Sequence, residues 1–293
     1  MLRRSTILRK ESVDTLAIGS FDGIHVGHRQ LINRLGVHGA LCVIDKDEAN
    51  LTPGIKRSEY AGCPCMFLHF LKVKHLSGAE FIALLQKEFV NLKKIVVGYD
   101  FFFGKHRACN AYDLQKLFDG EVEVVEEFTY QGISIHSSLI RTYLIEGRIE
   151  EANRFLGREY AITGSIVSGQ GIGKKELVPT LNLKISDYLI PHEGVYATRS
   201  RIGQNVYDSV SFIGTRHSTD GMFSVETHII GEDILEVTTP VELFFVAFLR
   251  DNQKFNALSD LKAQIVCDRE NAKKLLKTCY FYLGDFTKKN SHG

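Results

Sequence analysis

The chain has 293 residues, which is enough for two domains. Its 36 lysines and arginines nearly balance its 35 aspartates and glutamates, and neither half is strongly basic, which argues against nucleic-acid binding through bulk charge. No apolar stretch approaches the roughly 20 residues of a transmembrane helix. No signal peptide is expected, because no apolar core and cleavage site follow the basic N-terminus. The six cysteines show no Cys-x-x-Cys spacing, which favours reduced thiols and a cytoplasmic protein.

The first half alternates short apolar runs with helical patterns, which predicts a parallel sheet with helical crossovers. The expected strands cover 16–18, 40–44, 94–98 and 122–125, and the expected helices cover 30–35 and 79–89. Two short helices are expected between residues 138 and 156.

The pattern changes near residue 160, where short β-type runs punctuated by glycine predict an antiparallel barrel or sandwich. These strands are expected over 160–164, 194–198, 209–213, 225–230 and 241–249, before a closing helix over 258–276. The predicted fold class is α/β plus β, with one domain over 1–156 and a second over 157–293.

Residues 19–28, GSFDGIHVGH, form a glycine-rich turn between the first predicted strand and helix. The backbone N–H groups of such a turn and the positive end of a helix together form an anion site. His25 and His28 can both donate to one phosphate there. Two alternatives remain: a metal-binding pair, for which the sequence nominates no third ligand, and a structural turn with incidental histidines.

The same ten residues resemble the HxGH signature of the nucleotidylyltransferase superfamily, in the form found in the FAD synthetase domain of bacterial bifunctional riboflavin kinase/FAD synthetases. The resemblance extends over roughly residues 14–285. It implies a Rossmann-like nucleotidylyltransferase domain followed by a riboflavin kinase barrel with a terminal helix. It also implies that His25 and His28 stabilise the α-phosphate of ATP during adenylyl transfer, where fixed donors lower the barrier. The implied nucleotide contacts in this turn are Gly19, Phe21, Asp22, Gly23 and Gly27, with Asp22 near nucleotide or metal.

A second segment, VVGYDFFFGK at 96–105, resembles the family loop VVGxDFxFGK. The resemblance implies that the loop contacts flavin through Asp100, Phe103, Gly104 and Lys105. Taken alone, the aromatic run also fits the end of a core strand.

A third segment, IHSSLIR at 135–141, resembles the family motif ISSTxIR. The resemblance implies ATP contacts from Ser137, Ser138 and Arg141, which also suit plain capping of the following helix. The segment departs from the motif at His136 and Leu139, and a family stretch TFDPHP is barely recognisable at 43–48. A riboflavin kinase with an impaired adenylyltransferase half therefore stays open as the alternative.

In the second half, the glycine-rich segment 168–176 fails the Walker A pattern, because Ser168 replaces the first glycine and Lys175 the Ser/Thr. It could still hold phosphates through its backbone, or be a plain hairpin loop. The segment PTLN at 179–182 resembles the riboflavin kinase motif PTAN, which implies that Thr180 and Asn182 hold Mg²⁺ and ATP phosphates. The nucleotide contacts expected in the glycine-rich segment are Gly169, Gly171, Gly173 and Lys174.

The segment VETHII at 225–230 resembles the family strand VEVHLL, which implies that Glu226 is the general base of the kinase. Without that resemblance, the residues favour a solvent-facing strand glutamate. Arg216 and Arg250 are expected either as flavin or nucleotide contacts or as surface charges.

Together the motifs imply an enzyme that phosphorylates riboflavin with ATP to FMN and then adenylylates FMN to FAD, with Mg²⁺ in both steps. Its expected partners are these small molecules, with no nucleic acid and no membrane, and its oligomeric state is not predicted. Two further hypotheses remain: a flavin-binding regulatory protein without turnover, and an adenylyltransferase for a different acceptor.

Overall fold

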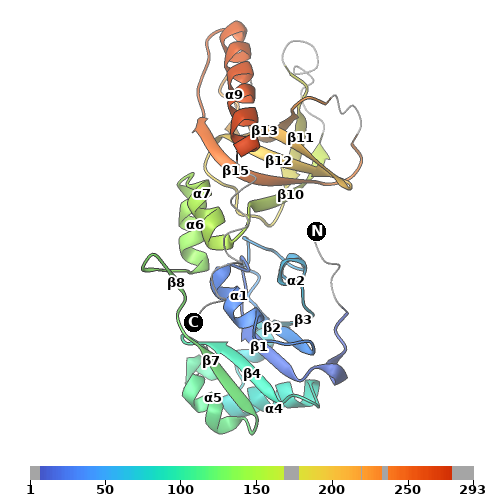
Figure 1. Cartoon of the computed structure of the whole chain (residues 1–293), viewed down its shortest axis with the longest axis vertical. Coiled ribbons are helices and arrows are strands. Elements are labelled where there is room, and N and C mark those ends of the chain that lie inside the picture. The colour runs from blue at the N-terminus through green and yellow to red at the C-terminus, as the bar shows by residue number, and fades with distance from the viewer. Residues whose placement is uncertain (1–6, 168–177, 219, 233–236, 279–293) are drawn as a thin grey trace. The chain divides into compact units, whose positions relative to one another are not determined.

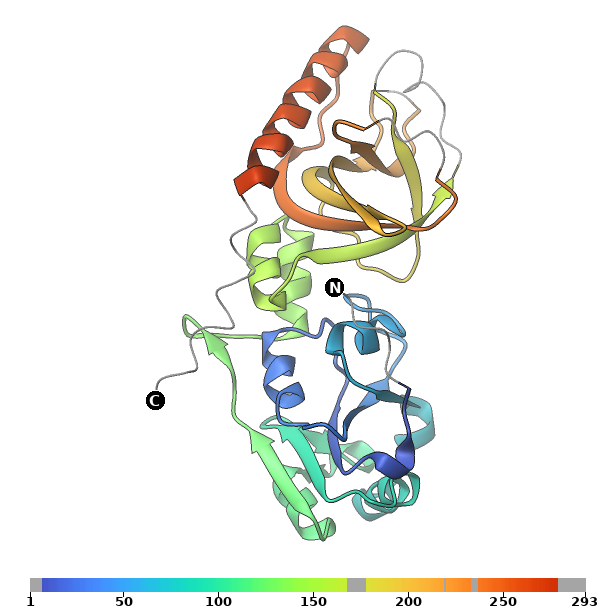
Figure 2. The same ribbon diagram turned by 45° about the vertical axis from the view of Figure 1, so that its right-hand side comes forward.

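The computed structural model describes residues 7–167, 178–218, 220–232 and 237–278 of the chain. The chain divides into two compact units, Met1–Ser137 and Ser138–Gly293, and each unit is described by itself below (Figures 1 and 2). In the described residues, no helix is both long enough and apolar enough to cross a membrane.

The first unit contains a five-stranded parallel sheet in the order β3-β2-β1-β4-β7 (Figure 1). Its strands are β1 (Thr15–Gly19), β2 (Gly39–Asp45), β3 (Cys65–His69), β4 (Lys94–Gly98) and β7 (Glu121–Val125). The helices between them are α1 (Val26–Ile32), α2 (Lys56–Ala61), α3 (Phe70–Val73), α4 (Gly78–Glu88) and α5 (Ala111–Leu117), with a 3-10 turn at Lys10–Ser12 and another at Lys105–Arg107. The predicted parallel sheet with helical crossovers is confirmed.

Both faces of this sheet are buried, because successive residues of its central strand enter two separate cores. Leu16 and Ile18 of β1 pack in a cluster with residues of α4 and α5. Ala17 between them packs in a second cluster with residues of α1 and α2. This arrangement explains why the sheet strands read as continuous apolar runs rather than as alternating ones.

Burial also raises the pKa of the Cys42 thiol in β2 to about 12, so this cysteine stays protonated at neutral pH.

The strand order reverses direction at β1. The chain moves from β1 to β2 and β3 on one side, then returns to β4 on the other side of β1. In open parallel sheets, the crevice at the carboxyl ends of two such strands is where ligands bind. The segments that follow β1 and β4 are the two motif-bearing segments 19–28 and 96–105, so the topology brings them to the same edge.

Two hairpins of two-residue strands and two capped helix starts complete the described part of the first unit. Strands β5 (Phe102–Phe103) and β6 (Cys109–Asn110) form one hairpin, and β8 (Thr129–Tyr130) and β9 (Ile133–Ser134) form another. A capping box at Ser77 and Glu80 begins α4, where the serine hydroxyl accepts from the Glu80 N–H and the glutamate accepts from the Ser77 N–H. A second capping box at Asn110 and Asp113 begins α5.

The second unit is a closed six-stranded antiparallel barrel with helices α6 (Ser137–Ile145) and α7 (Ile149–Leu156) before it and α9 (Leu258–Thr278) after it. The barrel strands follow the order β10-β11-β14-β13-β12-β15. Their bounds are β10 (Tyr160–Val167), β11 (Leu181–Ile185), β12 (Gly194–Ile202), β13 (Asn205–Thr215), β14 (Phe223–Ile229) and β15 (Val241–Asp251). The strand pattern alone left a barrel and a sandwich open, the family resemblance implied a barrel with a terminal helix, and the structure confirms that barrel.

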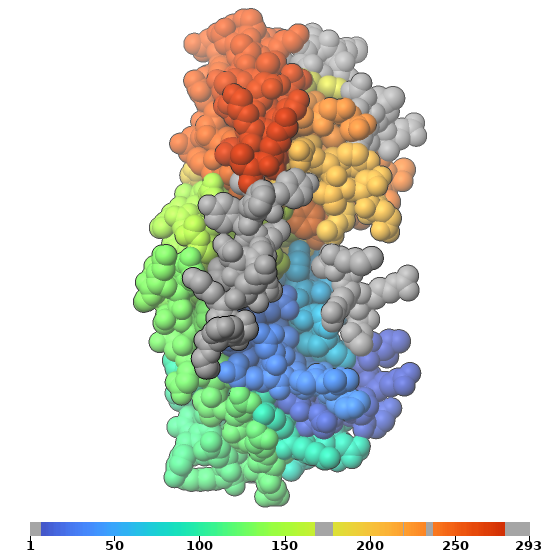
Figure 3. All heavy atoms as spheres, viewed as in Figure 1, coloured from blue at the N-terminus to red at the C-terminus, as the bar shows by residue number. Residues whose placement is uncertain are grey.

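Helix α9 lies on the outer face of the barrel, where it forms the red surface of Figure 3. Val195 and Ala197 of β12 pack outward against Ala272 and Leu276 of α9. The intervening positions of β12 point into the barrel, where buried hydroxyls bond one another in a ring. Its members are Thr198, Ser200, Ser209, Ser211 and Thr227, at oxygen separations of 2.8–3.2 Å. Each hydroxyl both donates and accepts in such a ring, so a polar interior is satisfied without water.

The division into units falls after Ser137, the first residue of α6, while the domain boundary after residue 156 stays a prediction. Helix α7 is bonded to the barrel. The Asn153 side-chain amide donates to the Phe245 carbonyl at 2.8 Å and accepts from the Tyr160 N–H at 2.6 Å. Apolar periodicity identified both helices, but which neighbouring unit they pack against depends on contacts that are distant in sequence.

Candidate functional sites

The first candidate site is the turn between β1 and α1, where the structure brings the two histidine rings together. Their centroids lie 3.6 Å apart and their planes are tilted by 18°. His25 is the N-cap of α1, and its Nδ1 accepts from the His28 backbone N–H at 3.3 Å. Because Nδ1 accepts, the proton of a neutral His25 ring lies on Nε2. His25 is buried and His28 is half-buried. The pair is therefore a fixed stack in which Nε2 of His25 is a donor.

Gly27 permits this stack. A Cβ atom at Gly27 would lie 3.1 Å from Nδ1 of His25, tighter than most real Cβ contacts. A larger residue would require the His25 ring to shift by a few tenths of an ångström. The small residue between the two histidines therefore leaves room for the ring where it lies.

The Asp22 side chain has a different position from the one expected. Its carboxylate is buried and accepts the backbone N–H groups of residues 50, 51 and 52 at 2.9–3.3 Å, and also the Thr52 hydroxyl at 3.3 Å. It therefore fastens the segment that follows β2 to the histidine turn. These bonds give the carboxylate a structural role, and its expected contact with nucleotide or metal stays a prediction.

Phe21, Gly19 and Gly23 also have structural roles in the turn. The Phe21 side chain is fully buried in the core, with φ of +53°, so only its backbone remains to meet a nucleotide. Gly19 packs on that ring, where a Cβ would lie 3.3 Å from it. Gly23 has φ of +87°, and its N–H donates to the Thr52 hydroxyl at 2.7 Å rather than facing outward.

The predicted ATP contacts in segment 135–141 fall on both sides of the unit boundary. The Ser137 hydroxyl donates to the Asp22 carbonyl at 2.7 Å, a contact within the first unit. Ser138 and Arg141 follow in α6 and belong to the second unit. A role for these two in the first site stays a prediction.

The loop after β4 presents a different aromatic residue from the predicted one. Phe103 is buried and packs against Phe81 and Phe101, so its ring does not face a ligand. Phe102 points to the opposite side, 48% exposed, with the Arg107 guanidinium 4.9 Å from its ring centre. Strand alternation, read in the right register, would have identified Phe102 as the exposed ring.

The other three predicted residues of this loop lie around the β5 hairpin. Asp100 and Lys105 are exposed, and the Lys105 N–H donates to the Leu76 carbonyl at 2.6 Å. Gly104 has φ of +74° and lies against the start of α4. Just before them, the Tyr99 hydroxyl donates to Glu127 at 2.9 Å, which raises the pKa of Tyr99. The exposed charges of this loop are therefore available to a ligand, while the glycine has a backbone role.

Asp22 can be tested by substitution with asparagine. One of the two carboxylate oxygens becomes an NH₂ group that faces backbone donors, so we expect a loss of about 1–3 kcal/mol in the free energy of unfolding. Urea denaturation followed by circular dichroism measures it. The exposed Asp119→Asn is the matched control and is expected to leave the midpoint unchanged. An unchanged midpoint for Asp22→Asn would contradict the structural position.

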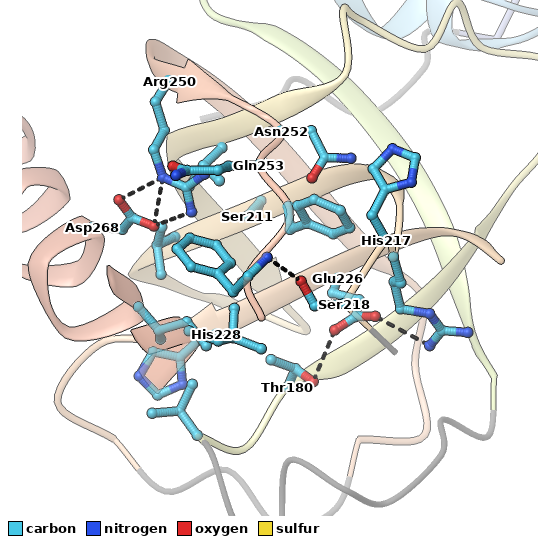
Figure 4. Close-up of a pocket in the computed structure, with 18 residues that line it drawn as sticks. Thr180, Ser211, His217, Ser218, Glu226, His228, Arg250, Asn252, Gln253 and Asp268 are labelled. Atoms are coloured by element: carbon cyan, nitrogen blue, oxygen red, sulfur yellow. Dashed lines mark hydrogen bonds and ion pairs between the residues drawn. The ribbon is translucent and has the colours of Figure 1, made fainter. Parts of the chain in front are cut away.

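The second candidate site is a cavity of about 170 Å³ on the outside of the barrel, between its strands and α9 (Figure 4). It is lined by Val178, Thr180, Val195, Val210, Ser211, Phe212, Arg216, His217, Ser218, Glu226, His228, Arg250, Asn252, Gln253, Phe255, Leu261, Ile265 and Asp268. The cavity thus brings together four residues that the sequence nominated from separate segments: Thr180, Arg216, Glu226 and Arg250.

Glu226 of β14 is held on both carboxylate oxygens. Its Oε1 accepts from the Ser224 hydroxyl at 2.9 Å and from the Arg216 Nη1 at 3.3 Å. Its Oε2 lies 3.5 Å from the Thr180 hydroxyl. Two of these partners, Ser224 and Arg216, fix the orientation of the carboxylate, and Figure 4 shows Oε2 directed toward Thr180. Glu226 is therefore not a freely solvated strand glutamate.

Asn182 and Thr180 lie next to this carboxylate. Asn182 of β11 is the direct partner of Glu226 across the antiparallel ladder, so their side chains share one face. Pro179, just before Thr180, has its carbonyl bound by Nδ1 of His228 at 2.8 Å. The strand pairing puts Asn182 on the same face as Glu226, and the Thr180 hydroxyl lies 3.5 Å from the carboxylate, although Asn182 does not line the cavity itself. The residues Gly169, Gly171, Gly173 and Lys174 lie outside the described part of the chain.

The two arginines are not isolated surface charges. Arg216 pairs with Asp220 at 2.6 Å as well as with Glu226. Arg250 pairs with the buried Asp268 of α9, with its Nη2 2.7 Å from Oδ2. Sequence reasoning missed Ser224 and Asp268. A signal was available for Ser224, which is two residues before Glu226 and so shares its strand face, whereas no local pattern links Asp268 to Arg250.

The oxygen groups around Glu226 suit a hard cation. Among the described residues, no cluster of three or more His, Cys, Asp or Glu side chains could hold a metal. Mg²⁺ needs no such cluster, because it keeps several waters and takes most remaining ligands from substrate phosphates. The hydroxyl of Thr180 and the amide oxygen of Asn182 fit that kind of site.

Comparison with known proteins places the chain in a family. Residues 156–276 match the riboflavin kinase family and residues 63–139 match the FAD synthetase family. The bifunctional riboflavin kinase/FMN adenylyltransferase of Buchnera aphidicola is 30% identical over 88% of this chain and 91% of its own length. The chain belongs to the family of bifunctional riboflavin kinase/FMN adenylyltransferases.

Two further proteins show a comparable likeness. The enzyme of Listeria monocytogenes is 27% identical over 88% of this chain and 91% of its own length. A crystal structure described as a macrolide-efflux protein from Streptococcus pneumoniae is 26% identical, with a TM-score of 0.81 over 89% of this chain and 94% of that one. The family likeness therefore extends over both units of the chain.

Proposed function

We propose that this chain phosphorylates riboflavin with ATP to FMN in its second unit and adenylylates FMN with a second ATP to FAD and pyrophosphate in its first. Family membership over most of the chain supports both activities. The observation that best supports the kinase activity is the position of the Glu226 carboxylate beside Thr180 at the cavity wall. The observation that best supports the adenylyltransferase activity is the pair of stacked histidines at the edge of the sheet where the strand order reverses.

In the kinase step, Glu226 accepts the proton of the terminal ribityl hydroxyl as its oxygen attacks the γ-phosphorus of ATP, and ADP leaves. Ser224 and Arg216 hold one carboxylate oxygen, so the other faces the reacting hydroxyl. Thr180 and Asn182 would hold Mg²⁺, which when bound neutralises charge on the transferring phosphate. The oriented carboxylate is the contribution of this chain's own side chains.

In the adenylyl step, an FMN phosphate oxygen attacks the α-phosphorus of ATP and pyrophosphate leaves. Negative charge grows on the α-phosphate oxygens, and a fixed N–H donor there stabilises the transition state without reorganisation. The Nε2 proton of His25 is such a donor because its Nδ1 is occupied by the helix cap. The exposed Asp100 and Lys105 remain candidates for the flavin phosphate side, together with the exposed Phe102 ring.

A coupled assay tests the proposal. The purified chain, riboflavin, ATP and Mg²⁺ are incubated, and FMN and FAD are separated by chromatography over time. We expect FMN to appear first and FAD after it, and EDTA to stop both. Starting from FMN separates the alternative of a kinase with an impaired first half, which would yield no FAD above background. Conversion of neither substrate would reject the proposal and favour a flavin-binding protein without turnover. We also propose a cytoplasmic location, where ATP is available.

A further inference from the structure

Arg250 is held in one orientation at the cavity by four hydrogen bonds. Its Nε lies 3.0 Å from each oxygen of Asp268, its Nη2 lies 2.7 Å from Oδ2, and its Nη1 donates to the Asp251 carbonyl at 2.9 Å. A side-on carboxylate of this kind fixes the plane of the guanidinium as well as its position. The orientation of Arg250 is therefore set by α9, which carries Asp268.

Asp268 is itself fixed. Its residue is 4% exposed, and Gln264, one helical turn earlier, donates to its Oδ1 at 2.8 Å. A buried carboxylate is costly unless it is paired and hydrogen-bonded, and here both conditions hold. The pair therefore behaves as one rigid element joining β15 to α9 at the cavity wall.

The bonds to Asp268 and Asp251 do not use all the N–H donors of the Arg250 guanidinium. A guanidinium has five N–H groups, and three of those of Arg250 are used: one on Nε and one on each terminal nitrogen. Within the described part of the chain, the second N–H of Nη1 and of Nη2 donates to no protein group. Two neighbouring donors on a fixed plane at a cavity wall match two neighbouring acceptors on a ligand.

The surroundings indicate which part of a substrate lies here. Figure 4 shows Arg250 and Asp268 on one side of the cavity and Thr180 and Glu226 on another. The phosphoryl chemistry belongs to the side of Glu226. The cavity wall contributed by α9 and the segment before it is apolar, with Phe255, Leu261 and Ile265. An apolar wall with a few fixed polar groups suits a flat heteroaromatic ring rather than a polyphosphate.

We propose that Asp268 is a positioning residue of the kinase half, which holds Arg250 so that its two terminal nitrogens bind a pair of adjacent acceptors on the edge of the isoalloxazine ring. This inference rests on the proposed riboflavin kinase function. It makes α9 part of the riboflavin site, although this helix carries none of the residues that the motifs nominated. The ring offers two such acceptor pairs, N5 with the C4 carbonyl and N1 with the C2 carbonyl.

The first test is Asp268→Asn, with riboflavin and ATP varied separately in the kinase assay. The amide keeps the shape of the side chain but loses the charge that fixes the guanidinium. We expect the riboflavin KM to rise about tenfold, as for a weakened hydrogen bond to a charged group, with the ATP KM changed by less than about twofold. FMN adenylylation, measured on the same preparation, reports whether the first unit is intact.

The matched control is Glu242→Gln. Glu242 is also a buried carboxylate on β15 paired with an arginine, Arg201, at 2.6 Å, but neither residue lines the cavity. We expect its loss to lower the melting temperature without changing the riboflavin KM. If both variants raise the riboflavin KM equally, general destabilisation explains the effect and the positioning role is wrong.

The second test needs no variant that could misfold. Binding of riboflavin, 5-deazariboflavin and 1-deazariboflavin to the unmodified chain is measured by flavin fluorescence. We expect one of the two analogues, which each lack one ring acceptor, to bind about tenfold more weakly, and Asp268→Asn to remove that difference. Equal binding of all three would overturn the inference, as would a raised ATP KM in Asp268→Asn. If the unmodified chain binds flavin but does not phosphorylate it, the proposed function fails while the binding test still decides the inference.

Discussion

Replacing Glu226 with glutamine is expected to lower the rate of riboflavin phosphorylation by about 10²–10⁴-fold, the contribution of a positioned general base. The amide keeps the shape of the side chain and can still contact Ser224 and Thr180, but it cannot accept a proton. The riboflavin KM is expected to change little, because Glu226 acts on the reacting hydroxyl rather than on the ring. Initial rates of FMN formation at saturating ATP measure the effect.

The control for Glu226→Gln is within the same chain. Adenylylation of supplied FMN uses the first unit and is expected to be unchanged, which shows that the protein is folded and active. Ser224→Ala removes one of the two groups that hold Oε1 and is expected to cost far less than the loss of the base. A Glu226→Gln variant that keeps more than about a tenth of the kinase rate would show that another group accepts the proton.

Replacing His28 with alanine is expected to lower FAD formation from FMN by about 10²–10³-fold, as for the loss of a fixed transition-state donor. The physical reason is twofold: His28 is itself a candidate donor, and its ring supports the His25 ring at 3.6 Å. Initial rates of pyrophosphate release with FMN and ATP measure it. Riboflavin phosphorylation is expected to be unaffected, the converse of the Glu226 result.

His25 requires a different variant, because its Nδ1 also caps α1. Asparagine is a good N-cap, so His25→Asn is expected to retain the helix while it loses the Nε2 donor. A loss of FAD formation without a loss of thermal stability would separate catalysis from capping. If His25→Asn and His28→Ala both keep wild-type FAD formation, the stacked pair is only structural.

The histidine turn shows the limit of motif reading. Ten residues were enough to nominate His25 and His28, and the structure stacks their rings. The same motif nominated Asp22 and Phe21, which have structural roles. Asp22 accepts hydrogen bonds from the segment after β2, and the Phe21 side chain is part of the core. A motif records which residues are needed together, but it does not separate those that contact a ligand from those that build the turn.

The loop after β4 and the cavity contain residues whose positions or roles the motifs did not reveal. Alternation in β5 decides that Phe102 faces out and Phe103 faces in, a difference of one residue that the aromatic run FFF conceals. Ser224 and Asp268 support Glu226 and Arg250 without belonging to any motif, and Asp268 comes from a helix 18 residues away in sequence from its arginine.

The sequence by itself determined the parallel α/β unit, the antiparallel unit after residue 160 and the nomination of Glu226, because apolar periodicity and short motifs are local properties of the chain. Tertiary structure alone decided that the barrel is closed, that α6 and α7 belong with it, and that Asp268 fixes Arg250. These outcomes depend on contacts between residues that are distant in sequence. Such contacts form only in the folded chain, so no local pattern of the sequence reveals them.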